Sequence, residues 1–450
     1  MSNGRQGWML VTALTFAAFL AFRWLTLVDA YAVNVFVSDQ WDFWDPMFRD
    51  ASLLEKFFHQ HGPHYMGVGY LVIDLVGRAS SWNVRAEAFV LVALSVLNTA
   101  LALWLKHRLV GRWHAWDALI PLMILSFKHY SVYLEGTNPS VTVVPLTLVL
   151  CTALFWTAKS RAWRYGGVLG LNAPAVCTAY TFLSTFVVLV LLALEMGLRW
   201  RRKEPVRWEV LGLCAAAVPL VLSFLALDSA MAAPSLIPAG YDPWAYLQFL
   251  EAVWANFVVV RNPLATHMVF GGVLVVHGLL ARWMAKRMSH EAAPGVLDRA
   301  WLSVVYLVGY SGLFAATCVV ARVGLGPDAA YAARYPMHLV PAFLGIYVFL
   351  LLAKSRWRQI ALALLGLSLL WGEVAAYRTY ERTVIVFSKG KARWVQTYLK
   401  TKEVARANRI SRFKVYPWDH ALPGIQAKLE HMERHHLGPF APGGRKRDPP

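Results

Sequence analysis

Charged residues are scarce in this chain of 450 residues: only 16% are Asp, Glu, Lys or Arg. Soluble domains carry about 25%. Hydrophobic residues make up 58%, and apolar stretches near the roughly 20 residues that a membrane-crossing helix needs recur along most of the chain. This composition excludes an ordinary soluble domain and indicates a protein that crosses a membrane several times.

The apolar stretches also lack the strict alternation of a membrane β-barrel. Because lipid offers backbone amides no hydrogen-bond partner, each stretch is predicted to be helical. Cysteine is nearly absent, and Cys151, Cys177, Cys214 and Cys318 all fall inside apolar segments without paired spacing. They are predicted to be small core residues and neither disulfides nor metal ligands.

The formal net charge of +18 lies largely in short loops. In a soluble protein such a charge would suggest nucleic acid, but in a membrane protein Lys and Arg collect in the cytoplasmic loops. Membrane lipids are therefore the expected surroundings, and no nucleic-acid partner is expected.

The predicted fold is an all-α polytopic membrane bundle of about eleven transmembrane helices. The segments are Trp8–Val28, Glu87–Leu105, Trp116–Leu134, Val141–Ala158, Tyr165–Ala179, Phe182–Leu198, Val210–Leu227, Leu264–Trp283, Trp301–Val320, Met337–Ala353 and Ile360–Tyr377. With the amino terminus inside, the basic clusters all fall on the cytoplasmic side, as the positive-inside rule requires. These clusters are Lys106–Arg112, Lys159–Arg164, Arg199–Lys203, Arg282–Arg287 and Lys354–Arg358.

Two further segments, His64–Trp82 and Tyr241–Val260, are predicted to be juxtamembrane or re-entrant helices on the outer face. The domain organisation is then a membrane module over residues 1–377, whose first outer loop covers 38–82. A small folded outer segment is expected over 378–437, followed by a disordered basic tail over 438–450, which is rich in Pro and Gly.

Carboxylates, tryptophans and histidines crowd into the stretch Ser38–Tyr65. Asp45 and Pro46 predict a helix start. The spacing of the next apolar residues predicts an amphipathic helix that lies on the outer leaflet. Its apolar face would contain Met47, Ala51, Leu54 and Phe58. The stretch indicates chemistry at a membrane surface.

Asp39 and Asp42 are three positions apart, so in a helix they share one face about 5–6 Å apart. Such a pair can raise the pKa of one carboxyl, which then acts as general base, or hold a divalent cation. No other cofactor is expected. The structural alternative is that Asp42 caps a turn and Asp39 is solvated.

His59, His61 and His64 lie close together, but Gly62 and Pro63 break any helix between them. Pro63 is predicted to start a new helix with His64 in its first turn, where free amides favour an anion. His64 is therefore predicted to contact a phosphate or hydroxyl, ahead of a metal-ligand role or a structural role at the interface.

Arg322 and Arg334 bracket a short outer loop and are suited to gripping a lipid-linked phosphate, with Tyr335 beside them. Snorkelling to ordinary headgroups is the alternative.

Trp41 and Trp44 are candidates for a platform that stacks on a sugar ring. Weaker candidates, which capping explains about as well, are Glu135, Asn138, Arg261 and Asn262.

The chain resembles polytopic C-type (GT-C) glycosyltransferases, which use polyprenyl-phosphate-linked sugars outside the membrane. SDQWDFWDP resembles the Asp-Asp-Trp-Asp sequence of some bacterial members, and HGPHY resembles their His-Asn-Glu-His-Arg element. ARVGLGPDAAYAARY resembles a later Gly-Arg…Gly…Ser-Arg-Tyr element. KVYPWDHALPGIQAKLEHMERHHLGPF resembles the terminal Tyr-Pro, paired-Leu, His-Leu-x-x-Phe segment.

Three positions depart from the family pattern: Ser38 replaces an acid, Tyr65 an Arg and Ala333 a Ser. The resemblance implies that Asp39 is the base, with Asp42, His61 and His64 around it. It further implies an inner-membrane enzyme that transfers a sugar, with inversion, from a polyprenyl-phosphate donor to a glycan or lipid acceptor in the periplasm. A polymerase or ligase acting on polyprenyl-diphosphate glycans and a lipid or polysaccharide transporter are the alternatives.

Overall fold

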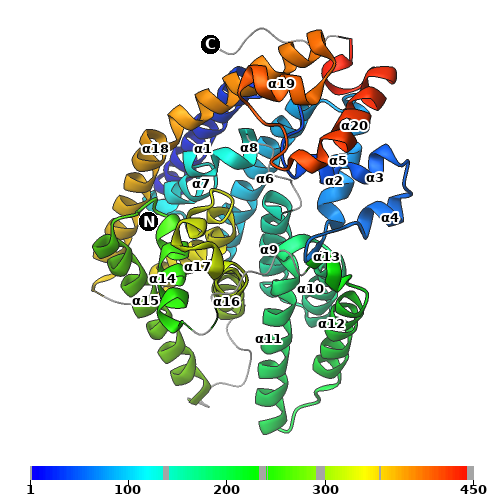
Figure 1. Cartoon of the computed structure of the whole chain (residues 1–450). Coiled ribbons are helices and arrows are strands. Elements are labelled where there is room, and N and C mark those ends of the chain that lie inside the picture. Colours follow the sequence, from blue (N-terminus) through cyan, green and yellow to red (C-terminus); the bar gives the residue numbers. More distant parts are fainter. Residues whose placement is uncertain are drawn as a thin grey trace.

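The computed structural model describes residues 3–134, 141–232, 240, 242–289, 299–353 and 356–442. Nearly all of them are helical, and the only strands in these ranges are β1 (Gln60–His61) and β2 (His64–Tyr65). The predicted all-α class is confirmed for this part of the chain (Figure 1).

The α-helices follow in chain order. They are α1 (Asn3–Tyr31), α2 (Gln40–Phe43), α3 (Asp45–Phe48), α4 (Leu53–Phe57), α5 (Gly67–Ala79), α6 (Val84–Val110), α7 (Leu119–Ile124), α8 (Tyr130–Leu134), α9 (Val143–Trp156), α10 (Arg161–Val176), α11 (Phe182–Arg201), α12 (Arg207–Leu225), α13 (Ser229–Ala232), α14 (Pro243–Asn256), α15 (Pro263–Ser289), α16 (Arg299–Arg322), α17 (Pro336–Leu352), α18 (Arg358–Thr401), α19 (Val404–Ser411) and α20 (Leu422–Arg434). Short 3-10 helices connect them: η1 (Ala115–Ala118), η2 (Phe127–His129), η4 (Ala179–Thr181), η6 (Val323–Leu325), η7 (Pro327–Tyr331), η8 (Asp419–Ala421) and η9 (Gly438–Phe440).

Seven helices in the described ranges are long and apolar enough to cross a membrane, namely α1, α6, α11, α12, α15, α16 and α18. The chain is therefore a membrane protein with several spanning helices. The other predicted spans fall on α9 and α17, which are apolar but shorter, on α10, and on an interrupted segment. The count of eleven stays a prediction.

Cys214 is exposed on α12 and so is not a core residue.

Exposed tryptophans mark one end of the bundle. Each lies at a helix end beside Lys or Arg: Trp8 in α1, Trp163 in α10, Trp200 in α11, Trp208 in α12 and Trp357 before α18. Tryptophan collects where a membrane meets water, so each of these helix ends lies near an interface, and the ion pairs of Glu209 with Arg161 and Arg199 join the ends of α10, α11 and α12. We call this end, with the loops after α6, α9, α11 and α17, the basic end.

The predicted span Trp116–Leu134 is wrong as a continuous helix. The structure has η1, α7, η2 and α8 in its place. Arg23 of α1 donates from Nη2 to the carbonyl oxygen of Leu125 at 2.9 Å, and Glu373 of α18 accepts from the amide of Phe127 at 3.0 Å. These side chains satisfy backbone groups that the break would leave without partners in the membrane.

The predicted amphipathic helix after Asp45 is also interrupted. It divides into α3 and α4 at Asp50, whose φ of 49° is left-handed. Ser52 starts α4 with a capping box, since its side chain accepts from the Glu55 amide while Glu55 accepts from the Ser52 amide. Met47 is buried, so it does not share an exposed apolar face with the residues of α4.

The two segments predicted to be juxtamembrane differ from each other. The first contains α5, which has 13 residues and spans only about 20 Å, too short to cross a membrane. The second contains α14 (Pro243–Asn256), whose burial fits the re-entrant alternative better than a helix on the membrane surface. Phe249 and Trp254 are buried against the bundle, and only Trp244 is largely exposed.

A single helix, α18, continues through residue 377, where we predict the membrane module to end. α18 has 44 residues and is about 66 Å long; in Figure 1 it runs along one edge of the molecule to α19. Its last turns, α19 and α20 form one core with the first outer loop, to which Trp44 and Trp394 contribute. The tail predicted to be disordered from residue 438 begins with η9, whose Gly438 and Pro439 are buried; residues 443–450 lie outside the described ranges.

Candidate active site

Two carboxylates and one imidazole converge in the segment between α1 and α5. Asp39 precedes α2 and Asp42 lies within it, and one helical turn joins them because the Phe43 amide donates to the Asp39 carbonyl at 2.9 Å. One ligand atom each from Asp39, Asp42 and His61 lies within 4.8 Å of the others. We call these three residues the acidic cluster. Asp39 is its exposed member.

A hairpin delivers His61 to this cluster. β1 and β2 pair antiparallel, with His61 opposite His64, and Gly62 makes the turn with a left-handed φ of 57°. The prediction that Pro63 starts a helix is therefore wrong, since α5 begins only at Gly67. Helix amides do not explain a phosphate contact by His64.

His64 nonetheless lies where an anion would meet positive charge. Its ring is 4.3 Å from the ring of Tyr180, and its buried Nδ1 has no hydrogen-bond partner among the described residues. Burial, with the charges of His61, Arg322 and Arg334, lowers the pKa of His64 to about 3. The ring is therefore neutral at physiological pH and can donate or accept a hydrogen bond.

The two predicted arginines reach the same region from another part of the chain. Arg322 ends α16, and Arg334 follows η7. The charges of Arg334 and Asp39 act on each other, which relates this loop to the acidic cluster. Tyr335 is buried under Arg334, with the guanidinium carbon 5.5 Å from its ring centroid, so it supports the arginine and has little surface to offer a ligand.

The carboxyl-terminal segment completes the cluster. Tyr416 donates from its hydroxyl to Oδ2 of Asp42 at 2.9 Å. Lys428 donates to the carbonyl oxygen of Trp41 at 2.7 Å and pairs with Asp45 at 3.1 Å. Burial raises the pKa of Asp42, although the hydrogen bond from Tyr416 and the charges of His61 and Lys428 work against this shift. Sequence reasoning missed all three contacts, because nothing local relates residues so far apart in the chain.

Trp41 and Trp44 do not form the predicted sugar platform. Their relative exposures are 0% and 2%. Both rings pack on Phe36, at 5.1 Å and 4.6 Å between centroids, and Trp44 also packs on Trp82. The two tryptophans hold the scaffold of the acidic cluster and present no free face to a ligand.

A second layer of polar rings lies below His64, and the sequence did not reveal it. The Tyr180 ring is 5.0 Å from that of His338 in α17. The Nε2 of His338 is 2.6 Å from the Val141 carbonyl oxygen, and its Nδ1 is 2.9 Å from the hydroxyl of Tyr310. A ring held on both nitrogens is fixed in place, so His338 supports Tyr180 and is not itself available to a ligand.

The weaker candidates either make local structural contacts or lie outside the described ranges. Asn262 accepts from the Ala265 amide at 3.2 Å and so caps α15, as the structural alternative predicts. Arg261 lies over the ring of Tyr331 at 5.1 Å. Glu135 and Asn138 belong to the residues that the structure does not describe.

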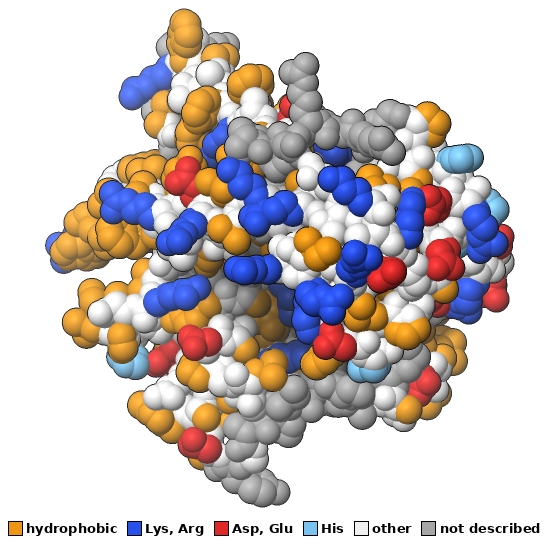
Figure 2. Space-filling view, turned by 45° about the horizontal axis from the view of Figure 1, so that its top comes forward, with side chains coloured by type: hydrophobic (Ala, Val, Ile, Leu, Met, Phe, Trp, Pro, Cys, Tyr) orange, Lys and Arg blue, Asp and Glu red, His pale blue; other side chains and the backbone are white. Residues whose placement is uncertain are grey.

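The arrangement combines a carboxylate pair, a neutral histidine and two arginines near one another. Figure 2 shows a hollow near the middle of the view, with Lys and Arg side chains and some Asp and Glu side chains around it. Carboxylates and an imidazole suit a divalent cation or a proton acceptor, and arginines suit a phosphate.

Comparison of the chain with known protein families, with curated proteins and with solved structures finds no match.

Proposed function

We propose that this chain is a membrane glycosyltransferase of the GT-C type. It takes a sugar from a polyprenyl-phosphate donor and attaches it to a hydroxyl of a glycan or lipid acceptor at the periplasmic face of the inner membrane. The observation that carries this proposal is the meeting of the acidic cluster with His64, Arg322 and Arg334, since the reaction requires a base beside a phosphate grip.

In the proposed reaction Asp39 accepts the proton of the acceptor hydroxyl while that oxygen attacks the anomeric carbon. The bond from the anomeric carbon to the phosphate oxygen breaks, and its electron pair leaves on the phosphate. Arg322 and Arg334 stabilise the departing charge. A single displacement inverts the anomeric carbon.

A divalent cation is compatible with the acidic cluster, because two carboxylates and one imidazole bring ligand atoms within 4.8 Å. Mg²⁺ and Mn²⁺ prefer such oxygen-rich sites. The ion would offset charge on the leaving phosphate, and Asp42 and His61 would hold it while Asp39 accepts the proton.

The test is transfer in liposomes with a lipid-linked sugar, after the lipid that co-purifies with the protein has been identified by mass spectrometry. Asp39→Asn should lower the rate at least about a hundredfold, because a positioned base contributes 10²–10⁴. Asp50→Asn is the matched control, since it removes an exposed carboxylate of the same loop at a position whose φ of 49° Asn tolerates. Full transfer by a folded Asp39→Asn protein would remove Asp39 from the role.

One observation favours transport of a lipid or polysaccharide as a second candidate function. The segment from η1 to α8 is interrupted and carries buried Lys128 and His129, and transporters use interrupted helices with polar groups inside the membrane. Lys128, however, donates to the Phe257 carbonyl at 2.9 Å. This contact favours a packed protein interior over a polar transport path across the membrane. A polymerase or ligase acting on diphosphate-linked glycans would require the same arginines, and the mass of the co-purified donor separates it from the first proposal.

A further inference from the structure

The basic end of the bundle contains a hollow of about 620 Å³. Three parts of the chain form it: the last turn of α6, the α9–α10 loop and the start of α16. Its lining includes Arg108, Thr157, Lys159, Ser160, Trp163 and Ala300. Pockets that hold small ligands have volumes of about 300–1,000 Å³. The hollow is therefore large enough for a headgroup.

This hollow is far from the acidic cluster. α6 begins at Val84, whose amide donates to Asn34 Oδ1 at 3.0 Å. Asn34 lies five residues before Asp39, so this end of α6 is on the side of the acidic cluster. Arg108 follows 24 residues later in the same helix, about 36 Å along its axis. The two sites thus lie at opposite ends of a membrane-crossing helix.

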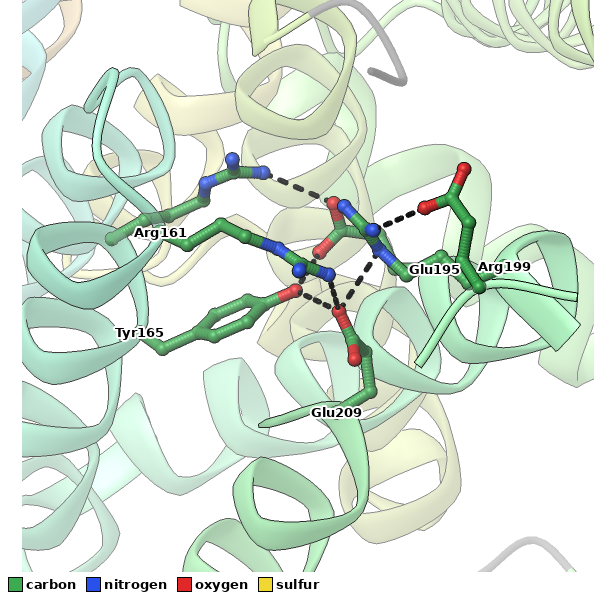
Figure 3. Close-up of polar contacts among 7 residues, drawn as sticks. Arg161, Tyr165, Glu195, Arg199 and Glu209 are labelled. Carbon is green, nitrogen blue, oxygen red and sulfur yellow. Dashed lines mark hydrogen bonds and ion pairs between the residues drawn. The ribbon is translucent and has the colours of Figure 1, made fainter. Parts of the chain in front are cut away.

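Arginines near the hollow are already neutralised. Figure 3 shows Arg161, Glu195, Arg199 and Glu209 joined in one network with Tyr165. Arg161 pairs with Glu209 at 2.6 Å, and Arg199 pairs with the same carboxylate at 3.0 Å. The hydroxyl of Tyr165 bridges Glu195 and Glu209 at 2.8 and 2.7 Å. These pairs neutralise Arg161 and Arg199 and leave little charge for a ligand, although Arg161 Nε and Glu209 Oε2 have no hydrogen-bond partner among the described residues.

Arg108 and Lys159 differ from that network. Neither pairs with a carboxylate among the described residues, and Arg108 instead lies 6.0 Å from the ring of Trp104. The lining adds the Ser160 hydroxyl and contains no acid, whereas the Thr157 hydroxyl already donates to the Leu154 carbonyl at 2.6 Å. Ser160 stands before α10 without capping it, so its side chain and the first amides of that helix remain available.

We propose that this hollow binds a phosphate monoester carried by a lipid or free in solution. Two cations match a dianion, and the Ser160 hydroxyl and the amides at the start of α10 supply donors for its oxygens. Trp163, which is 72% exposed, lies at the membrane interface, where the glycerol or prenyl portion of a lipid ligand would emerge. This site is independent of the transfer reaction proposed above.

The experiment is native mass spectrometry of the full chain in detergent, titrated with phosphatidic acid or with phosphatidylcholine of the same acyl chains. The wild type should retain one phosphatidic acid in preference to phosphatidylcholine. The double substitution Arg108→Gln/Lys159→Gln should weaken that binding about tenfold. Both side chains are exposed, so the variant should fold, and its thermal midpoint checks this.

The matched control is Arg201→Gln/Arg202→Gln, which removes two exposed charges from the same end but outside the hollow. Equal loss in both variants, or equal retention of the two lipids, would overturn the site, because general surface charge would then explain the binding. Inorganic phosphate provides the second arm. Displacement of the lipid by phosphate shows that the phosphate group alone is recognised, and retention against phosphate assigns the site to a lipid headgroup.

Discussion

The two carboxylates of the acidic cluster have different surroundings, and their roles follow from this difference. Asp42 is partly buried and accepts a hydrogen bond from Tyr416, whereas Asp39 is exposed. A held carboxylate suits a fixed task such as cation binding, and a free one suits proton transfer to a substrate that arrives from solvent. This contrast favours Asp39 as the base.

Tyr416→Phe tests whether the carboxyl-terminal segment positions Asp42. The substitution removes one hydroxyl and keeps the ring, so the fold should persist. A hydrogen bond to a charged group contributes about 1.5–3 kcal/mol, so kcat should fall about tenfold or more while the donor KM changes little. Steady-state transfer kinetics measure both quantities.

Tyr398→Phe is the control for this prediction, because Tyr398 lies in the same core but bonds only to Gln426 at 3.5 Å among the described contacts. A loss of kcat equal in the two variants would indicate that the segment acts through stability alone. Unchanged kinetics in Tyr416→Phe would show that Asp42 needs no positioning.

At the scale of residues, the part of the site that could be predicted consists of residues that are close together in the sequence. Asp39 and Asp42 lie three positions apart, so helical geometry alone places them on one face, and the structure confirms this turn. Tyr416 comes from 374 positions away, and no spacing rule connects it to Asp42. Trp41 was misjudged because residue type does not reveal whether a ring near a surface packs inward.

At the scale of elements, hydropathy predicted the long helices because burial in lipid demands long apolar runs. It failed for η2 because the partners of that break, Arg23 and Glu373, belong to distant helices. The helix-start signal of Pro63 was misleading at His64, because Gly62 and Pro63 turn a hairpin whose strands are only two residues long. Such short strands leave no alternating pattern to read.

Gly67 allows α5 to approach the end of α10 closely. A Cβ at this position would lie 2.0 Å from the carbonyl oxygen of Cys177, and the φ of 48° is left-handed. Gly67→Ala should therefore destabilise the protein by about 2–3 kcal/mol and lower its thermal midpoint by several degrees. Thermal unfolding in detergent measures the change.

Gly166→Ala is the control for Gly67→Ala, because nothing lies within 4 Å of its added Cβ and Ala is favoured within a helix. It should leave the midpoint unchanged or raise it. Equal stability of the two variants would show that α5 and α10 can move apart without cost.

A buried ion pair connects α4 to α5. The Nζ of Lys56 lies 2.7 Å from Asp74, and the side chains are 2% and 7% exposed. Lys56→Met would leave Asp74 with only Arg78, at 2.9 Å, and should cost about 2–3 kcal/mol, because a buried charge loses its closer partner. Unfolding in denaturant or by heat measures this cost.

The double substitution Lys56→Met/Asp74→Asn should recover part of that stability, since the carboxylate is then absent. Additive losses in the two single variants and the double variant would show that the pair does not stabilise the contact between α4 and α5.

At the scale of the whole molecule, the first outer loop and the carboxyl-terminal segment form one core. Trp44, Trp82, Trp394 and Leu429 are all buried in it. The Ser38 amide also donates to the Val415 carbonyl oxygen at 2.7 Å. Because these parts pack together, they lie on the same side of the membrane, whichever side that is. The proposed orientation can therefore be tested from the end of the chain.

A reporter fused after Pro450 should be active in the periplasm. The basic loops predict a cytoplasmic amino terminus, and α18 runs from the basic end to the core that contains Trp44. A fusion after Arg202, at the basic end, should report the cytoplasm and is the control. Reversed signals from the two fusions would place Asp39 and Arg334 in the cytoplasm. The donor would then have to be presented there, and the hollow that contains Arg108 would face the periplasm.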